Sequence, residues 1–522
     1  MYSIKKNIQQ LISLMVQHHI SDVVICPGSR NMPIAESLAS NDYFHCHAIT
    51  DERSAGFFAI GLSISLNKPV AVCVTSGSAL LNLASAISEA YYQQIPLLVI
   101  SADRPQAWIG QMDGQTLPQT QLFTSLLKKE VHLPEPKDST DEWYCNRLIN
   151  EAILALHHHS NGPVHINIPI SEPFFDCSVK EIPQERMIQR NAPYKNTWMD
   201  AQRPLFIVGQ LPVDEAKQLK ESLHTINCPV FCEHLSNLGD DTSFLYNADC
   251  ILNDEVAEEM KPDLVIYLGG HIVSKRIKKW IRQIQPSHCW RISSDGECSD
   301  TFQCLTNCIE QSPYDFMQSL APKAVNNEFL LRWQEASQKA EKANPRTACY
   351  TALSVVQRFI SLLPDNVSLI LANSSAVRYA QTVPIKAQNV YVSCNRGVNG
   401  IDGSLSAAIG YATAQPAREC YLIIGDLSFF YDMNGLWNNE LPQNLKIILL
   451  NNGGGEIFKT LPGLAETTGT EQFVRACHHT SAEGWAKSMN LNYIGNHEEA
   501  SVLTNLQQMI SASRLTLVEF FF

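Results

Sequence analysis

The sequence lacks a long apolar run, an export signal and an excess of positive charge. No apolar stretch reaches the ~20 residues that a membrane-spanning helix needs. The N-terminal residues Met1 to Val16 form an amphipathic helical pattern without the apolar region and cleavage site of a signal peptide. The net charge of −13 argues against nucleic acid or an anionic membrane as the main partner. We therefore expect a cytoplasmic protein with no integral membrane segment.

Two common kinds of cofactor site are also missing. There are 16 cysteines, but the tightest pairs, Cys228/Cys232 and Cys304/Cys308, lack the companion pairs of a zinc site. Without an export signal, reduced and mostly buried thiols are expected. No strand–helix junction carries a convincing G-x-G-x-x-G followed by an acidic ribose ligand, which disfavours a nicotinamide oxidoreductase.

The patterns that are present predict three α/β domains. At 522 residues the chain is too long for one ordinary core. Short apolar runs that read as buried parallel strands alternate with helical patterns throughout. We predict domains at residues 1–180, 190–345 and 350–522. The expected strands are Val23 to Cys26, Val70 to Thr75, Leu97 to Ser101, Val164 to Ile168, Leu205 to Val208, Val230 to Cys232, Leu264 to Leu268, Cys420 to Ile424 and Leu445 to Leu450.

The last two of these strands end in polar residues suited to a metal and a diphosphate. Asp426 follows the first strand and Asn452 follows the second. Ligands of parallel sheets bind beyond the carboxyl ends of the strands, and both side chains offer the hard oxygen atoms that Mg²⁺ accepts. A helix from Ser428 to Asn439, with Ser428 as N-cap, would connect the strands. The alternative is an ordinary strand–helix–strand unit in which the Asp caps the helix and the Asn-Gly run is a turn.

The first domain carries further polar groups at its strand ends. Cys26-Pro27-Gly28-Ser29-Arg30 follows a strand and precedes a helix, which favours an anion site or, alternatively, a simple turn with a surface Arg. Glu52 lies at another strand-to-helix junction, where an acid can simply complement the helix dipole. Thr75-Ser76-Gly77-Ser78 and Ser101-Ala102-Asp103-Arg104-Pro105 are further strand-end loops, and a helical pattern runs from Ala79 to Tyr92.

Taken together, these segments resemble one family. Gly425-Asp426 followed by Asn451-Asn452 resembles the fingerprint of enzymes dependent on thiamine diphosphate (ThDP). The whole set is similar to the 2-succinyl-5-enolpyruvyl-6-hydroxy-3-cyclohexene-1-carboxylate (SEPHCHC) synthase family of menaquinone biosynthesis, for which Gly-Asp-Leu-Ser is typical. The further segments that carry the resemblance are the strand-end loops of the first domain, Thr50-Asp51-Glu52-Arg53, Asn395-Arg396-Gly397, Gly400-Ile401-Asp402-Gly403 and, more weakly, Ser274-Lys275-Arg276.

The resemblance implies a pyrimidine-binding domain, a central domain and a diphosphate-binding domain. The cofactor would lie between the first domain of one subunit and the last domain of another, in a homodimer or homotetramer. Glu52 would protonate the aminopyrimidine ring, a task suited to a carboxyl group shielded from water. Asp426, Asn452 and the Gly454 carbonyl would bind Mg²⁺, or alternatively Mn²⁺. Ile401 would prop the bent cofactor, and Gly425, Leu427 and Ser428 would also contact it.

The resemblance also implies the substrates. The family decarboxylates 2-oxoglutarate and adds the resulting succinyl carbanion 1,4 to isochorismate, giving SEPHCHC and CO₂. Both substrates are dicarboxylates, which an acidic protein can hold only with local cationic groups. The expected substrate-binding residues are Ser29, Arg30, Arg104, Gln115, Lys275, Arg276, Ser374, Arg378, Arg396, Ile457 and Phe458. Ser374 and Arg378 would lie on one helix face, and the sequence around Gln115 departs from the family pattern.

Two alternatives stay open within the ThDP fold. One is another ThDP-dependent decarboxylase or carboligase, acting on pyruvate or a neutral 2-oxo acid. This enzyme would not need so many strand-end arginines. The other is a non-catalytic ThDP-fold subunit, which would typically lose the activating carboxylate or the metal ligands. Glu52, Asp426 and Asn452 are all present.

Overall fold

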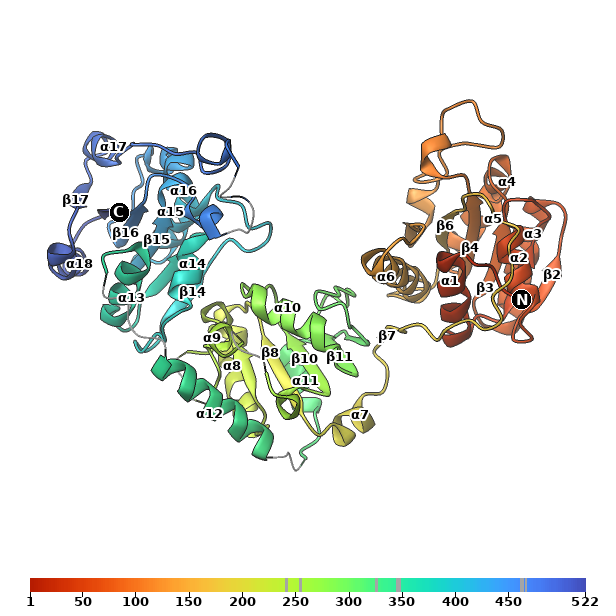
Figure 1. The fold of residues 1–522 in the computed structure, drawn as a ribbon, viewed down its shortest axis with the longest axis horizontal. Helices are drawn as coiled ribbons and strands as arrows, with labels where there is room; N and C mark the ends of the chain where they lie inside the picture. Colours follow the sequence, from red (N-terminus) through yellow and green to blue (C-terminus); the bar gives the residue numbers. More distant parts are fainter. Residues whose placement is uncertain (240–242, 253–255, 324–326, 344–348, 461–463, 465–466) are drawn as a thin grey trace. The chain divides into compact units, whose positions relative to one another are not determined.

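The computed structural model describes the chain except for residues 240–242, 253–255, 324–326, 344–348, 461–463 and 465–466. The chain packs as two compact units, residues 1–192 with 297–308 and residues 193–296 with 309–522. It contains three sheets of six strands, and every strand pairing described is parallel. The chain therefore has three α/β domains (Figure 1).

The N-terminal sheet has the strand order β2-β1-β3-β4-β6-β5. Its strands are β1 (Asp22–Ile25), β2 (His45–Ala48), β3 (Val70–Val74), β4 (Leu97–Asp103), β5 (Lys129–His132) and β6 (Val164–Pro169). Apolar residues on both faces of the sheet are buried, as expected for parallel strands covered by helices. One face packs against α1 (Lys6–Gln17), α2 (Met32–Ala39) and α6 (Ser139–Ala155). The other packs against α3 (Glu52–Leu66), α4 (Ser78–Asn82) and α5 (Ala84–Tyr92).

The middle sheet has the order β7-β12-β11-β10-β8-β9. The strands are β7 (Gln189–Arg190), β8 (Pro204–Val208), β9 (Val230–Cys232), β10 (Leu264–Leu268), β11 (His288–Ile292) and β12 (Asn307–Ile309). The helices are α7 (Lys195–Asp200), α8 (Val213–Thr225), α9 (Ala248–Ile251), α10 (Lys275–Ile284), α11 (Pro313–Ser319) and α12 (Asn327–Ala343). Phe206, Trp290 and Phe316 are fully or almost fully buried within this domain.

The C-terminal sheet has the order β14-β13-β15-β16-β18-β17. Its strands are β13 (Ser368–Leu371), β14 (Tyr391–Ser393), β15 (Cys420–Gly425), β16 (Leu445–Asn451), β17 (Asn492–Asn496) and β18 (Thr516–Phe521). The helices are α13 (Ala352–Leu362), α14 (Ser375–Ala380), α15 (Ser404–Ala414), α16 (Asp426–Tyr431), α17 (Glu483–Ser488) and α18 (Val502–Ile510). The central strands β15 and β16 are almost entirely buried.

Two predicted helices differ from the structure. The helix after Asp426 starts earlier and is shorter than predicted, with Gly425 as N-cap, and a 3-10 turn follows at Met433–Leu436. Ser428 is therefore not the cap, and its hydroxyl donates to the Ile401 carbonyl. The second difference is the single helix predicted from Ala79 to Tyr92, which is divided into α4 and α5 at Leu83.

Two expectations from composition can be compared with the structure. None of the sixteen cysteines, all of which lie in the described ranges, forms a disulfide, and most of them are buried. Among the described residues, no helix combines the length and the apolar character that a membrane span requires.

Candidate active site

The strand order of the C-terminal sheet reverses between β13 and β15. From β13 the chain continues to β14 on one side, and from β15 it continues to β16 on the other side. Ligands of open α/β sheets bind beyond the strands at such a point. A cavity of about 130 Å³ lies there. Asn373 and Ser374 follow β13 and line one side, whereas Asp426 follows β15 and Asn452 follows β16.

This cavity brings together many residues that the sequence selected separately. Every residue predicted to bind cofactor within the C-terminal domain lines it, with three of the predicted substrate residues. They are Ile401, Gly425, Asp426, Leu427, Ser428, Asn452 and Gly454, with Ser374, Ile457 and Phe458. These residues come from four separate stretches of chain, so a shared cavity is not a consequence of closeness in sequence.

Three oxygen-bearing groups converge inside the cavity. The Asn452 side-chain amide lies 2.6 Å from the Gly454 carbonyl oxygen and 3.2 Å from Asp426 Oδ2. With its nitrogen at this position, the amide donates to both oxygens. With its oxygen there, three oxygen atoms face one another, which is the donor set of a hard cation such as Mg²⁺. The residues present therefore fit a divalent metal.

The backbone holds the Asp426 carboxylate in place. Oδ1 accepts the N–H of Leu427 at 2.7 Å, and Oδ2 accepts the N–H groups of Gly454 at 2.9 Å and Asn452 at 3.1 Å. Gly454 has a φ of +146° and leaves no room for a side chain, because a Cβ atom would lie 2.8 Å from the Arg475 carbonyl oxygen. Burial raises the pKa of Asp426, against these hydrogen bonds, so a bound cation would stabilise the charged form.

Arg378 and Arg396 supply positive charge in the same unit. Arg396 is 6% exposed, donates to Asn373 Oδ1 at 3.0 Å, and has a buried Nε without a hydrogen-bond partner. Arg378 donates to the Ser374 carbonyl, and Ser374 is the N-cap of α14, one residue before the helix begins. Burial and the charge of Arg396 lower the pKa of Arg378, so an anion would stabilise the pair.

Sequence reasoning missed two ionisable residues near these arginines. Burial raises the pKa of Glu233 to about 6, against backbone hydrogen bonds from Val273 and Ser274, both at 2.7 Å. These bonds attach the start of α10 to the residue after β9. Burial also lowers the pKa of Lys278, which interacts electrostatically with Glu233 and Arg396. Only the fold brings these segments together, so no sequence motif could have found them.

Two predicted substrate residues, Lys275 and Arg276, form the first turn of α10. Both side chains are exposed. Arg276 donates to the Asp249 carbonyl, and Ser274, the N-cap, also bonds Asp249. Neither Lys275 nor Arg276 lines the cavity described above.

In the N-terminal domain, Glu52 begins α3 but does not cap it. Asp51 is the N-cap, and its carboxylate accepts the N–H of Ser54 at 2.7 Å. Glu52 Oε2 instead accepts a hydrogen bond from Asn82 Nδ2 at 2.9 Å. Glu52 lies in the first turn of α3, where an acid also complements the helix dipole, so that alternative stays open. Glu52 is partly exposed in this structure, so its shielding from water stays a prediction.

The strand order of the N-terminal sheet also reverses, between β1 and β3, and the strand-end loops meet there. A Cβ atom at Gly28 would lie 2.4 Å from Thr75 Cβ, and one at Gly77 would lie 3.2 Å from the Gln115 backbone. Burial raises the pKa of the Cys26 thiol to about 12, with a further contribution from nearby Glu52. The loops after β1, β2 and β3 are thus neighbours, as parallel strands predict.

Both predicted arginines of this domain already have partners. Arg30 is buried, donates to the Ile170 carbonyl at 2.9 Å, and lies 4.4 Å from the centre of the Phe174 ring. Arg104 donates to the Gly114 carbonyl at 3.1 Å and keeps a buried Nε without a hydrogen-bond partner. Ser29 is exposed beside Arg30. Contact of these residues with substrate stays a prediction.

Comparison with known proteins decides the family. Residues 6–125 match the family model for the N-terminal TPP binding domain of thiamine pyrophosphate enzymes, residues 178–371 match the middle domain, and residues 373–520 match the C-terminal TPP binding domain. A 2-succinyl-5-enolpyruvyl-6-hydroxy-3-cyclohexene-1-carboxylate synthase from Bacteroides fragilis is 50% identical over 94% of this chain and 91% of its own length. Proteins of the same name from Bacteroides thetaiotaomicron and Flavobacterium johnsoniae are 46% and 35% identical over 100% and 97% of this chain, and over 96% and 94% of their own lengths.

The chain belongs to the SEPHCHC synthase family. Its first domain is thus the N-terminal TPP-binding domain of that family, and the cavity between β13 and β15 lies in the C-terminal one.

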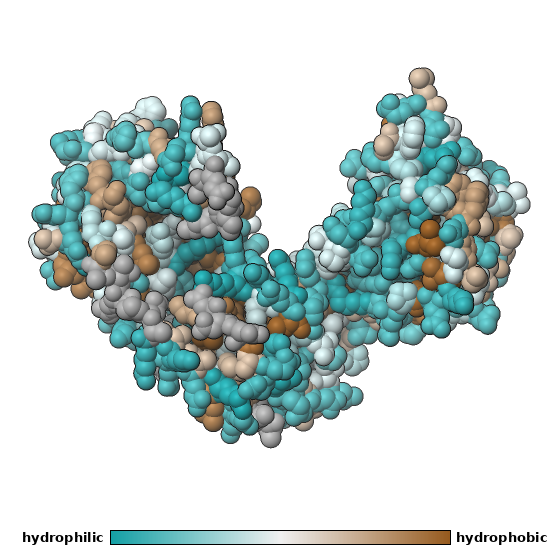
Figure 2. Space-filling view, in the orientation of Figure 1, coloured by the Kyte–Doolittle hydropathy of each residue, from teal (hydrophilic) through white to brown (hydrophobic). Residues whose placement is uncertain are grey.

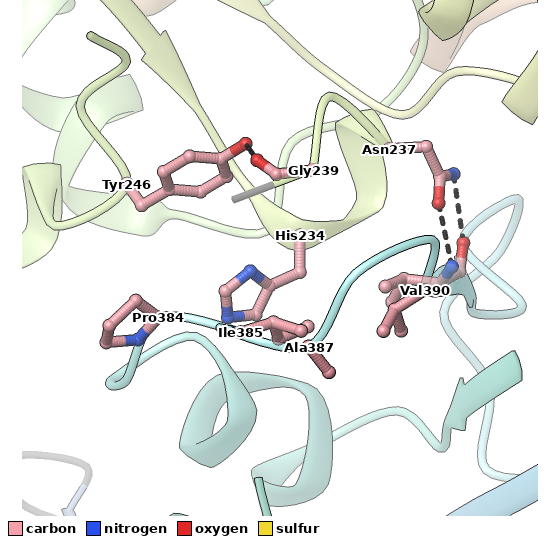
Figure 3. A pocket seen from close by; sticks show the side chains of 9 residues that line it. His234, Asn237, Gly239, Tyr246, Pro384, Ile385, Ala387 and Val390 are labelled. Carbon is pink, nitrogen blue, oxygen red and sulfur yellow. Dashed lines mark hydrogen bonds between the residues drawn. The ribbon is translucent and has the colours of Figure 1, made fainter. Parts of the chain in front are cut away.

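A second hollow lies within the same unit and apart from the cavity between β13 and β15. It lies between the segment after β9 and residues 384–392 (Figure 3). His234 Nε2 contacts the carbonyls of Ala380 and Val383, and Asn237 exchanges hydrogen bonds with the Val392 backbone. These polar groups already bond the chain itself, which indicates a packing role at this junction.

Proposed function

We propose that this chain catalyses the SEPHCHC synthase reaction. 2-Oxoglutarate loses CO₂, and its remaining succinyl unit adds 1,4 to isochorismate to give SEPHCHC. The observation that carries the proposal is the cavity between β13 and β15, which collects the predicted cofactor residues of the C-terminal domain in a family member. Two arginines of the same unit, Arg378 with a lowered pKa and Arg396 with a buried Nε that lacks a hydrogen bond, favour dicarboxylate substrates over a neutral 2-oxo acid.

Asp426, Asn452 and the Gly454 carbonyl would hold Mg²⁺, or Mn²⁺, against the cofactor's diphosphate. When bound, ThDP supplies a nucleophilic carbon and accepts the electrons released by decarboxylation. The fit is supported by the closeness of the three groups, since the Asn452 amide lies 2.6 Å from the Gly454 carbonyl oxygen and 3.2 Å from Asp426 Oδ2. Gly425, Leu427 and Ser428 form the start of α16 and would contact the diphosphate, and Ile401 lines the same cavity.

Glu52 would hold the proton that the aminopyrimidine ring shares with the protein. Asp51 is the N-cap of α3 and accepts the N–H of Ser54, so the Glu52 carboxyl group is not used as the cap. This supports the proposed role. Arg378 and Arg396 would bind substrate carboxylates. We also propose carboxylate or hydroxyl contacts for Ser29, Arg30, Arg104, Gln115, Lys275, Arg276 and Ser374, and apolar contacts for Ile457 and Phe458.

We further propose that the chain acts as a homodimer or homotetramer. Large apolar side chains are exposed on the helices that follow Glu52, at Phe57, Phe58, Ile64, Leu66 and Leu81. In Figure 2, brown and tan residues gather on the side of this domain where Figure 1 draws α3 to α5. Exposed apolar surface of this kind marks an interaction site. A cytoplasmic location stays a prediction from the sequence.

The direct test is an assay with 2-oxoglutarate, isochorismate, ThDP and Mg²⁺. We expect isochorismate to disappear in step with CO₂ release, and omission of 2-oxoglutarate to stop both. Pyruvate in its place should give less than about one hundredth of the rate, since it lacks the second carboxylate that an Arg can bind. Release of CO₂ from pyruvate and not from 2-oxoglutarate would instead identify another ThDP-dependent carboligase.

A further inference from the structure

Asn82, which no sequence pattern selected, forms a hydrogen bond with Glu52. It is the last residue of α4, and its Nδ2 donates to Glu52 Oε2 at 2.9 Å. We propose that Asn82 is a positioning residue for the Glu52 carboxyl group, and that the buried side chain of Gln119 fixes the turn that carries Asn82. The inference rests on the proposed role of Glu52 and adds the residues that orient it.

Close packing of α3 against the junction of α4 and α5 brings Asn82 to Glu52. Gly56 lies one turn after Glu52 on the same face of α3. A Cβ atom at Gly56 would lie 2.5 Å from Ala86 Cβ and 3.1 Å from Leu83 Cδ2, so the helices approach closely only because this residue is glycine. Leu83 is fully buried, which fixes the backbone next to Asn82.

The other end of α4 is fixed by Gln119. Gly77 is the N-cap of α4, and its N–H donates to Gln119 Oε1 at 2.7 Å. Gln119 is only 1% exposed, and its Nε2 donates to the Ala102 carbonyl at 3.1 Å and to Asn167 Oδ1 at 2.8 Å. Both ends of this amide are therefore used, and rotating it would break every one of these bonds.

The same network extends to the loop after β4. Asn167 donates to Asp103 Oδ2 at 2.8 Å, and Asp103 Oδ1 accepts the N–H of Arg104 at 2.7 Å. Gln119 thus links the start of α4 with the strand end that carries Arg104. Its own segment also includes Gln115, whose backbone packs against Gly77.

A donor on Oε2 affects Glu52 in two ways. It holds a flexible side chain in one orientation, and it places Oε2 at a fixed point beside α4. Both effects matter for a carboxyl group that must meet one ring nitrogen. Hydrogen bonds to charged groups are strong enough that losing this one should lower kcat about 10-fold to 100-fold.

A double-mutant cycle tests the link to Glu52. We expect Asn82→Ala to lower kcat by this factor, with ThDP affinity and both KM values within about threefold of wild type. In a Glu52→Gln background, Asn82→Ala should cause no further loss, because Asn82 acts through Glu52. Ser85→Ala, an exposed change on α5, is the control and should leave kcat unchanged. An equal loss in both backgrounds, or a loss of ThDP affinity alone, would overturn the inference.

Hydrogen exchange tests whether Gln119 fixes the start of α4, without any activity measurement. We expect Gln119→Met to accelerate exchange of the Gly77 amide at least about 10-fold, since its acceptor is gone. Gln119→Glu keeps an acceptor for Gly77, and should preserve that protection even if the variant loses stability elsewhere. Unchanged protection in Gln119→Met would contradict the step. A wild-type protein that leaves isochorismate untouched would instead refute the proposed function, and these exchange rates would be unaffected.

Discussion

The two outer domains have the same strand topology but carry different chemistry at the same place. Numbered within each sheet, both have the order 2-1-3-4-6-5. In the C-terminal domain, the point where the strand order reverses holds a small cavity with a buried carboxylate, beside which lie the Asn452 amide and the Gly454 carbonyl. In the N-terminal domain, it holds strand-end loops, a partly exposed Glu52 and exposed apolar helices. We call the C-terminal cavity the preformed half of the proposed site, because it is formed within one chain. The N-terminal half, with Glu52, would be shielded by another surface in the proposed dimer.

The largest expected effect tests the preformed half. Asp426→Asn should lower the affinity for ThDP and Mg²⁺ by about two orders of magnitude and abolish turnover, because it removes the charge of the oxygen cluster. Calorimetric titration of ThDP with Mg²⁺ present measures this. Asp432→Asn, just beyond the other end of α16, is the matched control, since Asp432 bonds Ser406 and does not line the cavity. Equal affinity in wild type and Asp426→Asn would remove Asp426 from the metal site.

Glu52→Gln should affect turnover and leave cofactor binding intact, which distinguishes the roles of the two halves. We expect kcat to fall about 10²-fold to 10⁴-fold, because amide cannot exchange the proton, while ThDP and Mg²⁺ still bind. Steady-state kinetics and cofactor titration on the same preparation give both numbers. Asp51→Asn is the control, because Asn caps a helix as well as Asp does. Full activity of Glu52→Gln would disprove the role assigned to Glu52.

Arg378→Ala probes the charge beside the preformed half. We expect KM for one dicarboxylate substrate to rise about 10-fold to 100-fold, the loss of a hydrogen-bonded charge pair. Arg358→Ala removes a surface ion pair with Glu499 in the same domain and should change KM less than about twofold. If both variants behave alike, Arg378 does not bind substrate.

The smallest effect concerns pH and the start of α10. Burial raises the pKa of Glu233 from 4.5 to about 6, so the folded state binds more protons than the unfolded state between these values. Stability should therefore fall as pH rises from about 4.5 to about 6, and stay level above that. The free energy of unfolding, measured by urea titration at a series of pH values, should follow this trend in wild type and lose it in Glu233→Gln. The same slope in both proteins would assign it to another group.

Apolar patterning predicted nine of the strands, and strand-end chemistry predicted residues that line the C-terminal cavity. Asp426 and Asn452 could be placed together because adjacent parallel strands end at one edge. The shorter α16 could not be predicted from local spacing, since the residue that ends it, Asp432, bonds Ser406 from a distant part of the chain. The strand order of the two outer sheets could not be predicted either. Strands buried on both faces require only apolar residues, and such residues do not specify which strands are neighbours.

The residues missed by sequence reasoning have partners far away in the chain. Asn82 meets Glu52 across 30 positions, and Glu233 meets Ser274 across 41. No local spacing encodes such contacts. They follow from helix packing and sheet order, so a structure was needed to find them.

The most direct test of the two-half account mixes two inactive variants, Glu52→Gln and Asp426→Asn. If each site joins the N-terminal half of one subunit to the C-terminal half of another, a mixed dimer has one intact site and one doubly defective site. Co-expression in equal amounts should then restore about one quarter of wild-type activity. If the mixture stays as inactive as either variant alone, although mixed dimers are present, both halves of each site come from one chain and the account is wrong.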